Sequence, residues 1–260
     1  MRLIRILAAS FSLSLRRELT FRANLVFQLL LTIVNIASSF LVLNAVYTQT
    51  RTLGGWRLGE SIILLGTFQM VSGIYSTFVE PNLSWFTGQV RAGKLDSVLV
   101  QPIASLFMVS LGKCAPLALS QVMLGLLAIG IGWHNLGTTP TWWGILGWLI
   151  LLSVGLIIAW SARILLACLS LWTPSMDLDV LYSALWQFGR YPVDVYRQPL
   201  SFFLTYVLPF AFLATFPAGM LTGRSGPRLL LIGIIVSALA ILFVHLAWQI
   251  SLRRYTSATS

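Results

Sequence analysis

Six long apolar runs constrain this chain more than any other feature of its sequence. The runs cover residues 24–47, 58–79, 104–132, 143–171, 199–222 and 228–250. A helix of about 20 mostly apolar residues is long enough to cross a lipid bilayer. The runs do not alternate between apolar and polar residues, as the strands of a membrane barrel would. We therefore predict an all-α, polytopic integral membrane protein with about six transmembrane helices.

The composition excludes a soluble enzyme. Of the 260 residues, 57% are hydrophobic and only 9% are charged, whereas about 25% are charged in a soluble domain. His134 and His245 are isolated, and Cys114 and Cys168 lack the paired spacing of a disulfide or metal site. We therefore expect no catalytic residues, no metal site and no cofactor on this chain.

The N-terminal residues have the pattern of an amphipathic helix. At about 100° per residue, apolar side chains gather on one face and arginines on the other. The apolar face has Leu3, Ile4, Leu7, Phe11 and Leu15, and the basic face has Arg2, Arg5, Arg16 and Arg17. We predict an amphipathic cytoplasmic or interfacial helix over residues 1–22, which anchors the chain or also contacts a partner. A six-helix transmembrane domain (23–252) and a cytoplasmic tail (253–260) follow.

The basic residues predict the orientation, because short loops rich in Lys and Arg stay in the cytoplasm. With the N-terminus inside, twelve basic residues fall on the inner side and four, Arg51, Arg57, Arg224 and Arg228, on the outer side. The inner set is Arg2, Arg5, Arg16, Arg17, Arg22, Arg91, Lys94, Lys113, Arg190, Arg197, Arg253 and Arg254. We therefore expect a plasma-membrane protein, in the inner membrane of a bacterium, with both termini cytoplasmic. The net charge of +10 indicates attraction to anionic lipid headgroups rather than to nucleic acid.

Residues 177–198 carry too many charges for a simple span. The charged residues are Asp177, Asp179, Arg190, Asp194 and Arg197. Burying them together in lipid would be costly. We therefore predict a cytoplasmic or interfacial helix and turn here.

Two features within the apolar runs are candidates for a translocation path or a hinge. Arg163 lies deep in an apolar run, where it either reaches the headgroups with its charged end or pairs with a partner and lines a path. Pro192, Pro209 and Pro217 each remove a backbone donor near the fifth run. This region is the best candidate for a moving or cavity-lining element.

The charged segment at residues 80–102 imitates a phosphate-binding loop without being one. Gly88 to Lys94 has the spacing of that motif, but Leu95 stands where a hydroxyl should reach Mg²⁺, and no buried strand precedes it. We therefore do not expect this chain to bind ATP.

The same segment resembles the cytoplasmic loop of a known family. The pattern consists of Arg91, Gly93, Leu95, Asp96, Leu99 and Pro102. It is similar to that of permease subunits of ATP-binding-cassette transporters of the type-2, exporter-like family. Arg190-Tyr191-Pro192 and the residues up to Pro217 resemble the family's fifth-helix region, and Arg253 to Ser257 resemble its ending. Tyr191 joins the candidate hinge residues through this resemblance.

The resemblance implies a permease that pairs with a second, identical or paralogous permease and with a separate cytoplasmic ATPase, which holds ATP and Mg²⁺. Residues 83–101 would form a coupling helix in a groove of the ATPase. Leu95 and Leu99 would supply its apolar anchors, while Arg91, Lys94 and Asp96 would fix its register. The alternative is an ordinary solvated loop. The family further suggests export of an amphiphilic or hydrophobic substrate; a stand-alone carrier, channel or assembly factor is the other open function.

Overall fold

The computed structural model describes residues 2–20, 22–91, 105–137, 139–171 and 178–254. These residues contain helices and no strand, which confirms the predicted all-α class. The helices are α1 (Arg2–Thr20), α2 (Arg22–Gln49), α3 (Leu58–Phe78), α4 (Glu80–Arg91), α6 (Ser105–Leu111), η1 (Pro116–Leu119), α7 (Ser120–Leu136), α8 (Trp142–Ser170), α9 (Leu178–Trp186), η2 (Gln187–Arg190), η3 (Val193–Val195), α10 (Leu200–Phe202), η4 (Phe203–Val207), η5 (Phe210–Phe212), α11 (Thr215–Leu221) and α12 (Arg228–Arg254).

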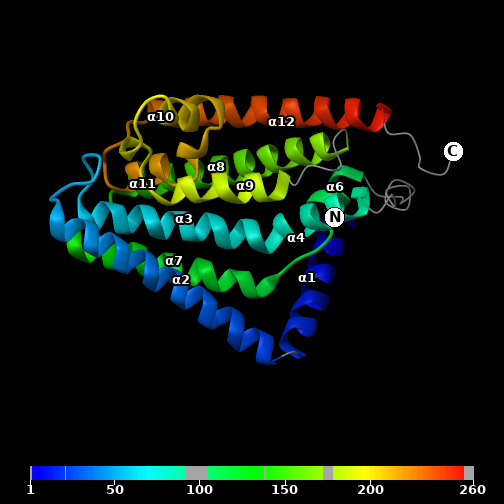
Figure 1. Ribbon diagram of the computed structural model, residues 1–260, viewed down its shortest axis with the longest axis horizontal. Coiled ribbons are helices and arrows are strands. Elements are labelled where there is room, and N and C mark those ends of the chain that lie inside the picture. The colour runs from blue at the N-terminus through cyan, green and yellow to red at the C-terminus, as the bar shows by residue number, and fades with distance from the viewer. Residues whose placement is uncertain (1, 21, 92–104, 138, 172–177, 255–260) are drawn as a thin grey trace.

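The long helices form a bundle with two distinct ends (Figure 1). The terminal end contains α1, α4 and the last turns of α12, where the rings of Phe86 and Trp248 lie 5.6 Å apart. The loop end contains the connections 50–57, 137–141 and 222–227, where Arg224 donates a hydrogen bond to the carbonyl oxygen of Gly55. Both ends of the described chain therefore lie at the same end of the bundle.

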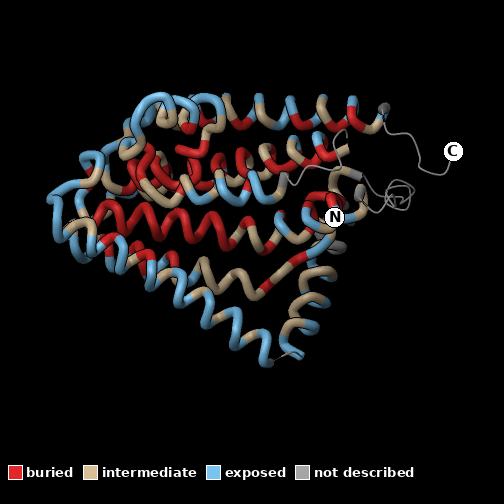
Figure 2. Tube along the Cα trace, in the orientation of Figure 1, coloured by how far each residue is buried: buried red, intermediate tan, exposed pale blue. Residues whose placement is uncertain are grey.

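The distribution of apolar residues places α3 at the centre. Five helical segments of the described chain, which include α2, α3, α7, α8 and α12, are long and apolar enough to cross a membrane. In the most apolar stretch of α3, 83% of the residues are buried inside the bundle, whereas in that of α2 only 6% are (Figure 2). Yet α3 is the least hydrophobic of the five. In lipid this distribution is expected, because small and polar residues favour helix interfaces and large apolar residues can face the acyl chains.

Helices α3 and α7 pack through a seam of glycines. Gly59, Gly66 and Gly73 follow one another at intervals of seven on α3, and Gly125 and Gly132 have the same interval on α7. A Cβ atom on Gly66 would lie only 2.6 Å from the carbonyl oxygen of Gly125, and one on Gly59 would lie 2.9 Å from that of Gly132. The antiparallel backbones therefore approach more closely than any other residue type would allow.

The prediction of one continuous span over residues 104–132 is wrong. Helix α6 ends at Leu111, and the helical path resumes only at Pro116, so that the candidate span covers Pro116–Leu136. Proline disfavours a helical conformation in the residue before it. The side chain of Asn82 on α4 accepts a hydrogen bond from the amide of Lys113 and donates one to its carbonyl oxygen, which satisfies the broken backbone.

The predicted cytoplasmic or interfacial helix and turn at residues 177–198 differs from the structure, in which the described residues of this segment lie along the length of the bundle. At the terminal end, the carboxylate of Asp179 accepts a hydrogen bond from Thr87. At the loop end, Trp56 Nε1 donates to Asp194 Oδ2 over 2.8 Å. Residues 178–195, here called the fifth crossing, thus run beside α3 and α8 from one end of the bundle to the other (Figure 1).

The charge argument failed because it assumed that the charges would meet lipid without partners. Asp179 pairs with Arg163, Arg190 bonds to Asn35, and Asp194 lies at the loop end. Arg197 follows at the loop end, so neither Arg190 nor Arg197 belongs with the basic residues of the terminal end.

The predicted span at 199–222 is a re-entrant hairpin that enters from the loop end and returns to it. Its two halves, Leu200–Val207 and Phe210–Leu221, meet at an angle of 74°. The carbonyl oxygen of Phe212 reaches Gly155, near the middle of α8, and Met220 returns to Gly144 at its start. Because the hairpin does not cross, the fifth crossing and α12 bring the C-terminal end back beside the N-terminal helix.

Helix α1 is confirmed as a helix, and it packs against the break between α6 and η1. The hydroxyl of Ser10 donates to the carbonyl oxygen of Gly112 over 2.7 Å, and Glu18 accepts from the amide of Leu117 over 2.9 Å. The interfacial position of α1 stays a prediction.

Candidate functional site

A polar cavity of about 330 Å³ lies between the helices that surround the centre of the bundle. Side chains from α2, α3, α4, α7, α8, α9 and η2 line it. They are Leu31, Thr32, Asn35, Phe68, Gln69, Ser72, Tyr75, Ser76, Glu80, Gln121, Arg163, Tyr182, Ser183, Trp186, Gln187 and Arg190. The cavity lies between the terminal end, marked by Glu80, and the middle of α2, marked by Asn35. Its polar lining at membrane depth makes it the candidate functional site.

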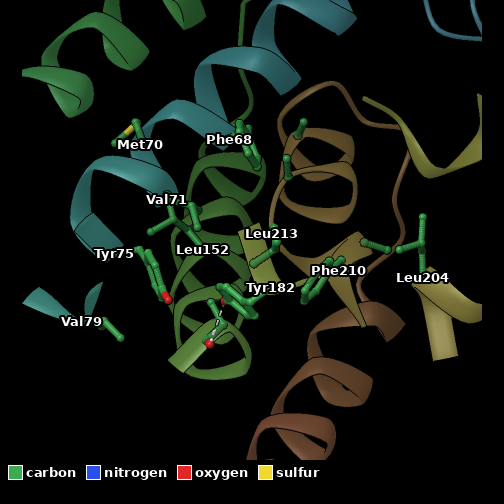
Figure 3. Packing of buried hydrophobic residues seen from close by; sticks show 14 of the residues in the cluster. Phe68, Met70, Val71, Tyr75, Val79, Leu152, Tyr182, Leu204, Phe210 and Leu213 are labelled. Atoms are coloured by element: carbon green, nitrogen blue, oxygen red, sulfur yellow. Dashed lines mark hydrogen bonds between the residues drawn. The ribbon is translucent and has the colours of Figure 1, made fainter. Parts of the chain in front are cut away.

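Aromatic residues of α3 and the fifth crossing form one wall of the cavity. The ring of Trp186 stacks on that of Tyr75 with centroids 4.6 Å apart, and Tyr182 lies beside both. The rings of Tyr75 and Tyr182 face each other in the core, where Tyr182 donates to the carbonyl oxygen of Ala159 (Figure 3). Trp186 Nε1 also donates to Ser72. These contacts hold the wall rigid, since each ring packs against at least one other.

One lining residue, Arg163, forms an ion pair with Asp179. Arg163 Nη1 lies 2.6 Å from Asp179 Oδ1, and the guanidinium stacks over the ring of Tyr182 at 5.2 Å. The side chain of Arg163 is only 6% exposed, whereas that of Asp179 is 31% exposed. Arg163 therefore turns into the protein and pairs, and does not extend to the headgroups.

Arg190 faces the cavity from the fifth crossing without a carboxylate partner among the described residues. Its Nη2 donates to Asn35 Oδ1 on α2 over 3.0 Å. Its Nε is buried and has no hydrogen-bond partner in the described part of the chain. The side-chain amide of Asn35 is neutral, so it does not neutralise the positive charge of Arg190.

Polar contacts join the connecting segments at the loop end of the bundle. Glu60 accepts from the amide of Arg57 at the start of α3 over 2.8 Å and pairs with Arg224 over 3.0 Å. Arg224 also stacks over the ring of Trp56 at 4.8 Å, and Trp56 holds Asp194. These contacts join the start of α3, the end of the fifth crossing and the re-entrant hairpin.

The predicted hinge residues lie apart from the cavity, except for Arg163. Tyr191 and Pro192 separate η2 from η3, and Pro209 separates η4 from η5. Pro217 lies in the first turn of α11, where a missing amide hydrogen costs no helical bond. Three of these four residues thus mark real breaks in the helical path.

Most of the predicted coupling residues lie outside the described residues: Gly93, Lys94, Leu95, Asp96, Leu99 and Pro102. Arg91 is the last residue of α4. This helix is not a solvated loop, because Asn82, Leu83, Phe86 and Thr87 are buried in the bundle.

The aromatic wall and the Asp179 pairing were not predicted. One signal was available: Gln69, Ser72, Ser76 and Glu80 follow at spacings of three and four, which place them on one face of a helix. Such a polar stripe in an apolar run indicates a face turned toward protein or water.

The fold and the cavity define the class of the molecule: it is a polytopic helical membrane protein with a polar site between its helices. The sequence profile described as ABC-2 family transporter protein matches residues 33–259. The match covers most of the chain, so the protein belongs to this family and is a membrane permease subunit of an ATP-binding-cassette transporter. Membership implies a partner ATPase. No curated protein and no solved structure is significantly similar to the chain.

Proposed function

We propose that this chain forms half of the translocation path of an exporter and is driven by a separate cytoplasmic ATPase that holds ATP and Mg²⁺. The observation that carries the proposal is the polar and aromatic cavity between the helices of the bundle. A site of this kind offers polar contacts and ring surfaces together, which suits an amphiphilic cargo. The terminal end would face the cytoplasm of a bacterial cell, since α1 brings Arg16 and Arg17 to it.

A second permease would complete the path. The rim of the cavity carries polar side chains that are exposed in the single chain, among them Asn35, Ser183 and Gln187. Exposed polar side chains are costly against lipid. A second permease against α2 and α9 would cover this rim and join two cavities.

Helix α4 supplies a route from the ATPase to the cavity. It follows α3 after one non-helical residue, Val79, and contains residues 83–91 of the predicted coupling helix, which are partly buried in the bundle and so leave only the part after Arg91 for the ATPase. Its Thr87 donates a hydrogen bond to Asp179 over 3.2 Å, and Asp179 pairs with Arg163 of the cavity. A movement of the segment after Arg91 would therefore be transmitted to Arg163 through two contacts, Thr87 with Asp179 and Asp179 with Arg163.

Mutation of the coupling segment tests the pairing with the ATPase. We expect Leu95→Ala and Asp96→Arg to lower retention of the co-purified ATPase about tenfold, because an anchor lost from a packed groove costs ~1–3 kcal/mol. Membrane insertion should be unchanged. The matched control is Leu231→Ala, which shortens a leucine that is 67% exposed on α12. Full ATPase binding and full transport in the Leu95 and Asp96 double variant would contradict the proposed coupling role.

Cysteine labelling tests the orientation and the re-entrant hairpin together. In a background with Cys114 and Cys168 replaced, we expect cysteines at Thr139, Gln198 and Gly226 all to react with an impermeant reagent applied from outside. All three positions are exposed at the loop end. A cysteine at Gln198 that is protected while one at Gly226 reacts would mean that the hairpin crosses the membrane.

A further inference from the structure

We infer that the cavity selects a cargo with an anionic headgroup, which Arg190 binds, and with an apolar part that extends past the rim. This inference rests on the proposed function, because it names the substrate class of the same cavity. Three observations support it: the missing carboxylate partner of Arg190, the unpaired donors and the mixed polar and apolar lining of the cavity.

Arg190 is the one arginine of the cavity lining that has no carboxylate partner among the described residues. Asp179 neutralises Arg163 at 2.6 Å. Glu80 lies exposed at the rim, where it accepts a hydrogen bond from Ser76. Arg190 has only the neutral amide of Asn35 among the described residues. Arg190, which is half-buried beside the exposed Asn35 at the rim, therefore carries a positive charge that no carboxylate of the described residues neutralises, and its guanidinium is free to pair with an anion.

Three buried donors of the cavity lack an acceptor in the described part of the chain. They are Arg190 Nε, Arg163 Nε and the hydroxyl of Tyr75. A buried donor without a partner costs free energy, so such groups are expected to meet an acceptor in the working protein. A phosphate, sulfate or carboxylate has several acceptor oxygens and forms strong hydrogen bonds with guanidinium groups.

The lining of the cavity favours an amphiphile over a compact anion. Its volume of about 330 Å³ is at the lower end of the ~300–1,000 Å³ of ligand pockets. The apolar surfaces of Leu31, Phe68 and Trp186 line the same space. A headgroup and the first carbons of a chain would fill the cavity, and the rest of the chain would pass between α2 and α9.

Binding of matched single-chain amphiphiles tests the inference. Native mass spectrometry of the purified protein in a neutral maltoside detergent would compare dodecyl phosphate with dodecyltrimethylammonium. We expect dodecyl phosphate to bind at least tenfold more tightly, and Arg190→Gln to remove most of that difference. Arg51→Gln, which removes an exposed arginine at the loop end, should leave binding unchanged. Inorganic phosphate at the same concentration should not compete.

Each other result overturns the inference. Equal binding of the cation would exclude an anionic site, and equal losses in both arginine variants would show attraction to the whole basic surface. Competition by inorganic phosphate would indicate a site for a free anion. Failure of the proposed function is distinguishable: a protein that binds dodecyl phosphate through Arg190, yet moves no amphiphile with its ATPase and ATP, would not be an exporter of that class.

Discussion

Replacement of Gly66 by leucine is expected to lower the apparent midpoint of thermal unfolding in detergent by roughly 6–12 °C. A side chain at this position would meet the carbonyl oxygen of Gly125, since even a Cβ would lie 2.6 Å from it. Forcing α3 and α7 apart costs about 3 kcal/mol, and each kcal/mol shifts the midpoint by about 2–4 °C in a chain of this size. Fluorescence-detected size-exclusion chromatography after heating measures the effect.

The control for this substitution lies on α7 itself. A Cβ on Gly130 would meet nothing within 4 Å, so Gly130→Leu should leave the midpoint unchanged or raise it, because leucine favours a helix more than glycine does. Similar losses in Gly66→Leu and Gly130→Leu would contradict the glycine seam.

The two single substitutions that break the ion pair of the cavity should differ in how much stability they cost. We expect Asp179→Asn to destabilise the protein by ~3 kcal/mol, because it leaves the buried guanidinium of Arg163 without its carboxylate. Arg163→Met should cost less, since the carboxylate of Asp179 is 31% exposed and can be hydrated. Chemical denaturation in mixed micelles measures both.

The double variant separates the interaction between the two side chains from the effect of each substitution alone. Asp179→Asn combined with Arg163→Met should be more stable than Asp179→Asn alone, because no charge is then left buried. Strictly additive losses would mean that the two side chains do not interact in the folded protein.

Long apolar runs made much of the fold predictable. The runs at 24–47, 58–79, 143–171 and 228–250 correspond to α2, α3, α8 and α12 within a few residues, because a helix in lipid depends on length and hydrophobicity alone. Length could not reveal the break before Pro116, since that break is satisfied by Asn82 from another helix. The charges of the fifth crossing led to a wrong prediction for the same reason. The residues that pair with these charges are distant in sequence.

The cavity was predictable only in part. Arg163 was a candidate because its charge stands out in an apolar run, and two interpretations were open. The ion pair with Asp179 distinguishes between them. Asp179 lies sixteen positions further along the chain, in a segment whose charges predict a surface position. Tyr75 and Trp186 carry no charge, and their meeting depends on the path of the fifth crossing past α3.

The order of the fifth crossing in the chain bears on how such a polar segment can enter a membrane during synthesis. Nearly all its polar contacts are made to residues that precede it: Trp56, Ser72, Thr87 and Arg163 are already translated when Asp179 emerges. Among the described residues, the later residues that it bonds to are Tyr196, which follows it directly, and Thr215, which accepts from the amide of Val193. The segment can therefore partition against a preformed protein surface rather than into bare lipid, so its biogenesis depends on α3 and α8 having been inserted before it.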